Sequence, residues 1–188
     1  MEREVSEQGY RSGKDMVKWQ QSIAAELLKT MDFPHKRELV IVCIGSDRAT
    51  GDSLGPLVGS FLEKEHSSLF SLYGTLELPV HAKNLSVVLD EIGHRYKHPY
   101  ILAIDACLGR KENVGGIQIG PGPLKPGEGV KKELPSIGDA FIKGIVNTMS
   151  HMDSMVIQST RLFLVMKLAE AIHGGILLYL KYIQRQKR

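Results

Sequence analysis

The chain has 188 residues with a formal net charge of +3, and 43% of its residues are hydrophobic and 24% charged. This length supports one domain with a full hydrophobic core, and the ordinary composition excludes a disordered, fibrous or repeat protein. The small net charge gives no case for nucleic-acid binding. The polar N-terminal segment lacks the apolar stretch of a secretory signal, and charges interrupt the apolar segment 155–183. We therefore expect a cytoplasmic protein without a membrane span.

The first part of the chain predicts a helix and then a strand-loop-helix unit. Residues 1–14 are expected to be a flexible lead-in, and apolar residues at helical spacing predict a helix over 15–31. The continuous apolar run Leu39–Ile44 is typical of a strand covered on both faces, as in a parallel sheet. A polar loop containing glycines follows it, and the next helix is expected over 56–64, with proline at its start.

The middle of the chain predicts a second buried strand that runs directly into an acid. A short strand is expected at 74–78 and a helix over 85–92, with Asn84 as its N-cap. The run Tyr100–Ile104 is continuously apolar and is followed at once by Asp105. A second strand of this kind indicates a sheet that is buried on both faces.

The last part of the chain predicts three helical segments after a loop rich in proline and glycine. The expected elements are a strand at 116–119, a loop at 120–129, a helix at 137–146, a helix at 154–172 and a last helical segment ending at 183. His173, Gly174 and Gly175 are expected to separate the last two segments. Alternating strands and helices predict a single α/β domain over 15–188, with a mostly parallel sheet between helical layers.

Acidic residues follow both buried strands, where open α/β sheets bind their ligands. Asp47 and Asp52 lie in the loop after the first strand, and Asp105 ends the second. Ionised acids at the ends of buried strands are costly unless they are paired, hydrated or coordinated. Asp47 fits a turn residue, and Asp52 fits a helix cap as well as a catalyst. No obvious helix follows Asp105, so a functional role is favoured there.

Two neighbouring carboxylates support two kinds of hydrolytic chemistry. They can share a proton, so that one activates water while the other protonates a leaving group. They can instead hold a divalent metal ion that activates the water. Spacing in the sequence does not choose between these. His81, which follows a predicted strand, is the one histidine kept as a further candidate for the site.

Three segments resemble the spore germination proteases, in the same order along the chain. Residues 50–56 read TGDSLGP, where that family has T-P-D-A-L-G-P after a strand. Residues 101–110 read ILAIDACLGR and resemble the apolar strand ending in I-D-A-L. Residues 117–134 resemble the third block, a strand followed by a proline-glycine loop and a basic pair. Size and pattern resemble the small sporulation proteins of the YyaC type, and the wider fold family includes the hydrogenase-maturation peptidases.

The resemblance implies a three-layer α/β/α fold and places the family's two acids on Asp52 and Asp105. These acids are catalytic in germination proteases, and in hydrogenase-maturation peptidases they bind a metal together with a later histidine. Gly51 departs from the family's proline, and no histidine lies between His98 and His151. That gap favours a metal-free pair without a cofactor, with a metal at the two acids as the alternative.

The function expected from this resemblance is a sporulation peptidase that uses Asp52 and Asp105. Its partners would be protein or peptide substrates, with the small acid-soluble spore proteins as candidates, and neither nucleic acid nor a membrane. The segment 120–129 would border the cleft. The alternative is a catalytically inactive binding or regulatory protein that kept the peptidase fold. The sequence is compatible with a monomer or an oligomer.

Overall fold

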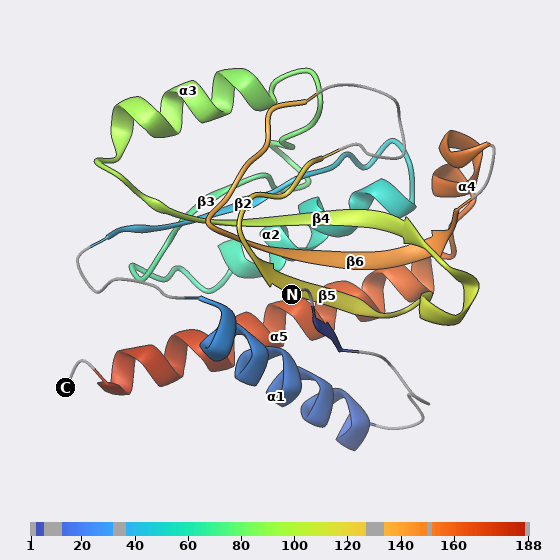
Figure 1. Ribbon diagram of the computed structural model, residues 1–188, viewed down its shortest axis with the longest axis horizontal. Coiled ribbons are helices and arrows are strands. Elements are labelled where there is room, and N and C mark those ends of the chain that lie inside the picture. Colours follow the sequence, from blue (N-terminus) through green and yellow to red (C-terminus); the bar gives the residue numbers. More distant parts are fainter. Residues whose placement is uncertain (1–2, 6–12, 32–36, 127–133, 150–151, 187–188) are drawn as a thin grey trace.

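The computed structural model describes residues 3–5, 13–31, 37–126, 134–149 and 152–186 (Figure 1). These residues form a six-stranded sheet in the order β1-β5-β6-β4-β2-β3. The strands are β1 (Arg3–Val5), β2 (Leu39–Cys43), β3 (Ser71–Tyr73), β4 (Tyr100–Gly109), β5 (Ile117–Pro121) and β6 (Ala140–Thr148). The α-helices are α1 (Gly13–Thr30), α2 (Leu54–Glu63), α3 (Leu85–Arg95), α4 (Asp153–Gln158) and α5 (Leu162–Gln186). Two short 3₁₀ helices are η1 (Gly51–Ser53) and η2 (Lys111–Asn113).

The sheet is mostly parallel. The strands β3, β2, β4 and β6 run parallel to one another, whereas β5 pairs antiparallel with both β6 and β1. The two apolar runs seen in the sequence pair directly, with Leu39 opposite Tyr100 and Cys43 opposite Ile104. The prediction that they are parallel strands of one sheet is therefore confirmed.

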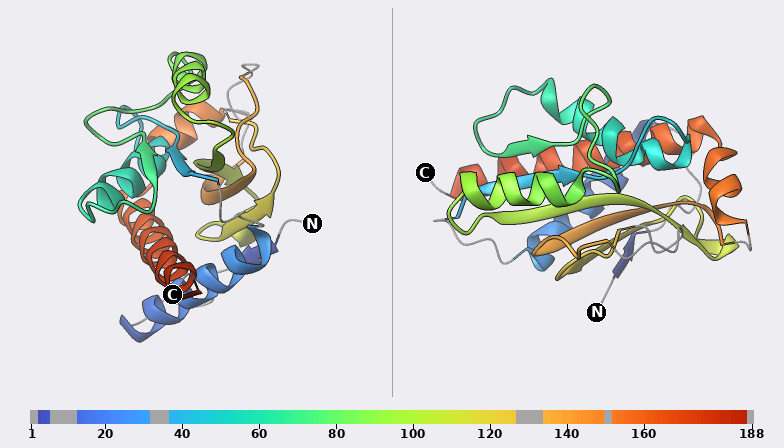
Figure 2. Two further views of the ribbon diagram at one scale, coloured as in Figure 1. Left: turned by 90° about the vertical axis from the view of Figure 1, so that its left-hand side faces the viewer. Right: turned by 90° about the horizontal axis from the view of Figure 1, so that it is seen from above.

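Helices cover both faces of the sheet, which gives the predicted three-layer α/β/α fold (Figures 1 and 2). Alternate residues of each strand point to opposite faces, so β2 and β4 contribute to two separate cores. Ile41 and Leu102 pack on the side of α1, α2 and α5, whereas Val42 and Ala103 pack on the side of α3. Strands buried on both faces explain why the two runs are continuously apolar.

The long helix α5 lies in the core of this domain, packed against α1 and α2. By length and composition it could also cross a membrane, and 44% of that apolar stretch is buried inside the domain. Gly174 and Gly175 lie inside α5 and do not break it. A Cβ atom at Gly174 would meet the Gln20 side chain at 2.3 Å, and one at Gly175 would meet Ile23 at 2.4 Å. The two glycines let α1 approach α5 closely.

Several predicted elements are corrected by the structure. The segment 137–146, expected as a helix, contains β6, which pairs with both β4 and β5. The strand expected at 74–78 lies earlier, as β3, and Thr75 begins a turn there, its amide bonded to the Leu78 carbonyl. The helix expected over 154–172 is two helices, α4 and α5, which separate at 159–161.

Other expectations are confirmed or refined. The helix expected over 15–31 is α1, and the strand expected at 116–119 is β5. Within the expected lead-in, residues 3–5 form β1, which pairs with β5. The helix expected over 85–92 is α3, but the side chain of its N-cap, Asn84, accepts the amide of His81 instead of a helix amide. Part of the proline-glycine loop, residues 127–129, lies outside the described residues.

Candidate active site

The loop after β2 folds back tightly over the carboxyl edge of the sheet. Gly45 has a φ of +140°, and a Cβ atom there would lie 2.0 Å from the Asp52 carbonyl oxygen. The Ser46 amide donates a hydrogen bond to that carbonyl at 3.1 Å. Only glycine fits such a close approach at this φ. The loop thereby brings Asp52 back toward the end of the strand.

Asp52 is half-buried within η1 and does not cap a helix. The N-cap positions of η1 and α2 are Thr50 and Ser53. Burial raises the pKa of the Asp52 carboxyl, and the Ser46 amide and the charge of His81 partly offset that rise. The sequence left a cap and a catalyst equally open for Asp52, and its position removes the first alternative.

Asp105 is the more deeply buried acid, with 8% of its surface exposed. It lies within β4, which continues to Gly109, so the strand does not end at the acid as expected. The Ala106 amide donates to its Oδ1 at 2.8 Å. The pKa of Asp105 is raised well above its usual value, first by burial and then by the charge of Asp52. The charge of Asp52 thus acts on Asp105, which directly follows the last residue of β4 that pairs with β2.

One further side chain acts on each acid: His81 lowers the pKa of Asp52, and Lys143 lowers that of Asp105. His81 follows Val80, whose carbonyl accepts the Gly45 amide at 2.8 Å, so the loop before α3 is fastened to the loop after β2. Lys143 lies opposite Asp105 in the pairing of β6 with β4, and its charge lowers the pKa of that acid.

Lys143 was missed by the sequence analysis because its segment was assigned to a helix. The signal that was available is the segment 140–148, which reads AFIKGIVNT. Isoleucine, valine, threonine and phenylalanine favour a strand, and Gly144 is unfavourable inside a helix.

The other acid and the serines of the loop take structural roles. Asp47 is exposed in a turn, where the Arg48 amide donates to Ser46 Oγ at 3.2 Å. Ser53 Oγ donates to the Thr50 carbonyl at 2.7 Å. Asp52 thus acts electrostatically on Asp105, and His81 acts on Asp52, whereas Asp47 lies in the solvent.

Gly51, which stands where the germination proteases have proline, packs against the last turn of α4. A Cβ atom at Gly51 would lie 2.9 Å from both the Ile157 carbonyl oxygen and Thr160 Oγ1. Asn147 on β6 donates to the Val156 carbonyl and to Thr160 Oγ1, each at 3.2 Å, and so fastens α4 to the sheet. Glycine in place of proline at this position thus accompanies a close contact between η1 and α4.

The donor set for a metal ion is incomplete among the described residues. No group of three or more histidine, cysteine, aspartate or glutamate side chains lies within reach of one ion in the part of the chain that the structure describes. Asp52 and Asp105 supply two carboxylates. His151 lies outside the described residues. The described residues alone therefore do not complete a metal centre.

Comparisons with known proteins agree with this fold. The family profile described as "Protein of unknown function (DUF1256)" matches residues 10–175. The chain is 50% identical over 152 residues to the uncharacterized protein YyaC of Bacillus subtilis strain 168, which covers 81% of this chain and 74% of that protein. The crystal structure of the [NiFe] hydrogenase maturation protease HycI from Thermococcus kodakarensis KOD1 superposes with a TM-score of 0.53. It is 19% identical, over 79% of this chain and 96% of that one, and the likeness shows a shared peptidase-like fold.

Proposed function

The chain belongs to the DUF1256 family, a family of unknown function, and from that membership and the peptidase-like fold we propose that it hydrolyses peptide bonds during sporulation. Asp52 and Asp105 are its catalytic acids and share one proton. The resemblance of three sequence blocks to the spore germination proteases suggests the process. Its substrates are proteins or peptides, and it works in the cytoplasm.

The observation that carries this proposal is the difference between the two interacting acids. Asp105 is buried, and both its burial and the neighbouring charge favour its protonated form. Asp52 is half-buried and receives help for its ionised form from the Ser46 amide and from His81. Two carboxyl groups whose surroundings push their pKa values apart can serve as acid and base together. In this pair Asp105 is the acid and Asp52 the base.

The proposed reaction follows from these protonation states. The Asp52 carboxylate takes a proton from a water molecule as the water oxygen bonds to the scissile carbonyl carbon. The Asp105 hydroxyl donates a hydrogen bond to the carbonyl oxygen, where negative charge develops. The C–N bond then breaks, and the leaving amine takes the proton that Asp52 had accepted. One water is consumed, and a carboxylic acid and an amine are released.

The direct test is to incubate the purified chain with small acid-soluble spore proteins and to identify fragments by mass spectrometry. We expect new termini with the wild-type chain and none with Asp52→Asn or Asp105→Asn. The matched control is Asp47→Asn, an exposed acid of the same loop, which should cleave as the wild type does. The same cleavage by all four proteins would exclude the acid pair as the catalyst. Absence of cleavage by all four, with complementation of a sporulation defect by every variant, would indicate a binding protein that kept the fold.

A further inference from the structure

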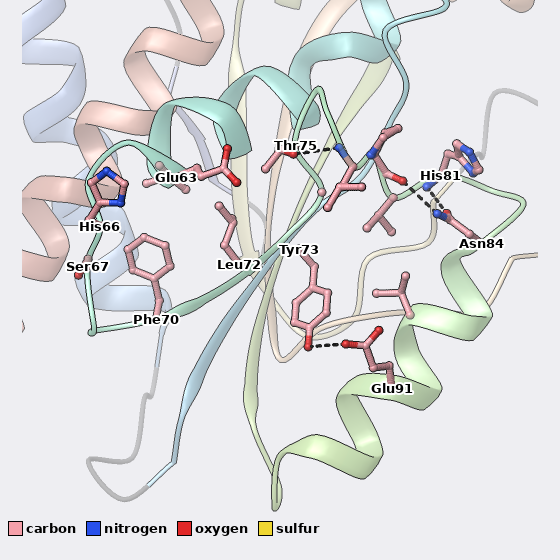
Figure 3. Close-up of a pocket in the computed structure, with 16 residues that line it drawn as sticks. Glu63, His66, Ser67, Phe70, Leu72, Tyr73, Thr75, His81, Asn84 and Glu91 are labelled. Carbon is pink, nitrogen blue, oxygen red and sulfur yellow. Dashed lines mark hydrogen bonds between the residues drawn. The ribbon is translucent and has the colours of Figure 1, made fainter.

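A hollow of about 660 Å³ runs along the outer edge of the sheet beside β3 (Figure 3). Leu72 and Tyr73 are neighbours in β3 and point to opposite faces, Leu72 toward the core with α2 and Tyr73 toward the core with α3. Both nevertheless line the hollow. The hollow therefore spans the edge of the strand itself and does not lie on one face. In the sheet that the described residues form, β3 is an outer strand.

The walls of this edge hollow are apolar, and the charges at its rim are acidic. Leu72 and Tyr73 lie between Glu63 at the end of α2 and Glu91 on α3, and Phe70 also lines the hollow (Figure 3). The Tyr73 hydroxyl donates to Glu91 Oε1 at 3.2 Å, which holds that carboxylate at the rim. No lysine or arginine is among the residues that line the hollow in the described part of the chain. The carboxylates of the rim are Glu63 and Glu91, and two histidines, His66 and His81, also line the hollow.

We propose that the edge hollow binds an extended peptide segment that carries a lysine or arginine side chain. The outer edge of a sheet offers backbone groups to an added strand, and pockets beside the edge select its side chains. A lysine or arginine has a long apolar stem that packs on aromatic and aliphatic walls and a cationic head that reaches carboxylates. The walls at Phe70 and Leu72 fit the stem, and Glu63 and Glu91 fit the head.

The edge hollow shares one residue with the surroundings of Asp52, although neither acid lines it. His81 lines it, and the charge of the same side chain acts on Asp52. The hydrogen bond from the Gly45 amide to the Val80 carbonyl joins the wall of the hollow to the loop that carries Asp52. This inference rests on the proposed function for its claim that the bound segment is a substrate. It adds the substrate class, a chain that is extended and basic near its scissile bond.

The test measures binding separately from cleavage, in the full-length Asp52→Asn variant. The probe is a fluorescein-labelled octapeptide, Gly-Ser-Thr-Val-Arg-Val-Thr-Ser, and its partner carries citrulline, a neutral side chain of the same shape, in place of arginine. Fluorescence anisotropy should show the arginine peptide binding about fivefold more tightly, since a partly exposed ion pair contributes about 1 kcal/mol. Adding Glu63→Gln and Glu91→Gln together should abolish that preference.

The matched control is Asp90→Asn, which makes the same charge change on α3 outside the lining of the hollow. It should preserve most of the preference for arginine. Equal affinity for the two peptides, or no binding at about 1 mM protein, would overturn the inference. Retention of the preference in the double glutamine variant would do the same. If the arginine peptide binds but the wild-type chain cleaves no substrate, the hollow stands as a binding site and the proposed hydrolysis fails by itself.

Discussion

Asp139 and Asp105 lie at opposite edges of the sheet, and the surrounding residues accommodate these two acids in different ways. At the amino edge, Asp139 accepts the Ile101 amide at 2.8 Å, and Arg37 Nη2 lies 3.1 Å from both of its carboxylate oxygens. At the carboxyl edge, Asp105 accepts the Ala106 amide and lies within reach of the charge of a second acid, Asp52.

Asp139 stabilises the fold, whereas Asp105 lowers its stability. Arg37 also donates to the carbonyls of His98 and Pro99, so the Asp139 site joins three segments at the amino edge. A charged pair that is hydrogen-bonded in this way stabilises the structure. The Asp105 site instead keeps a buried carboxyl next to a like charge, which disfavours ionisation of both. Such an arrangement is typical of catalytic sites.

The largest effect is expected when the two acids of the carboxyl edge are neutralised. Asp52→Asn and Asp105→Asn should each lower peptidase activity about a thousandfold, because the two acids act as one unit. The free energy of unfolding should stay the same or rise, since Asp52→Asn removes a poorly compensated charge and Asp105→Asn removes a buried acid whose ionised form is disfavoured. Cleavage assays and urea unfolding of both variants measure these effects. Full activity of Asp52→Asn would remove the acid pair from the mechanism.

The amino edge should respond in the opposite way. Arg37→Met should lower the free energy of unfolding by about 1–2 kcal/mol, because Asp139 loses its ionic partner and both groups are about one-third exposed. Activity per folded molecule should be unchanged. The control is Arg185→Met, an exposed arginine near the end of α5, which should leave stability as it was. A loss of activity in Arg37→Met without a loss of stability would contradict a purely structural role for the Arg37–Asp139 pair.

The same contrast explains which parts of the molecule could be predicted from the sequence. The strands β2 and β4 were visible because burial on both faces leaves a continuous apolar run, and the acids after them marked the carboxyl edge. Their pairing, which places Cys43 opposite Ile104, brings the following loops together. The fold and the location of the candidate site therefore followed from local patterns.

Other elements depend on contacts that are distant in the sequence. The strand β6 is held by pairing with β4 and β5, which adds to the strand-favouring residues of a segment that was expected to be a helix. Gly174 and Gly175 suggested a helix end, yet both lie within α5. Side chains at these positions would collide with α1, so the glycines allow the two helices to pack closely. The role of Lys143 became visible only once its strand was placed beside Asp105.

The pH dependence of stability sharpens the assignment of Asp105. An aspartate has a pKa of about 3.9 in the unfolded chain, and that of Asp105 is raised in the folded chain. Between these two values the folded state binds more protons, so the free energy of unfolding falls as the pH rises. Asp105→Asn should remove most of this fall and leave the smaller part that comes from the raised pKa of Asp52. Asp52→Asn should reduce the fall, because the charge of Asp52 contributes to the shift of Asp105. Urea unfolding from about pH 4 upward measures both. Parallel curves for the three proteins would contradict the assignment.

The smallest expected effect concerns His81, which distinguishes the environment of Asp52 from that of Asp105. The charge of His81 lowers the pKa of Asp52, so His81→Gln should raise that pKa. The acid limb of the pH–activity profile should move to higher pH by the same amount, with little change at its plateau. A ¹³C NMR titration of the Asp52 carboxyl carbon measures the shift without an activity assay.

The matched control is His94→Gln, because His94 lies on the exposed face of α3, with Nδ1 2.6 Å from the Asp90 carbonyl oxygen. An unchanged Asp52 titration in His81→Gln would show that His81 only lines the edge hollow. A large loss of activity at the plateau would instead make His81 a direct participant in the reaction.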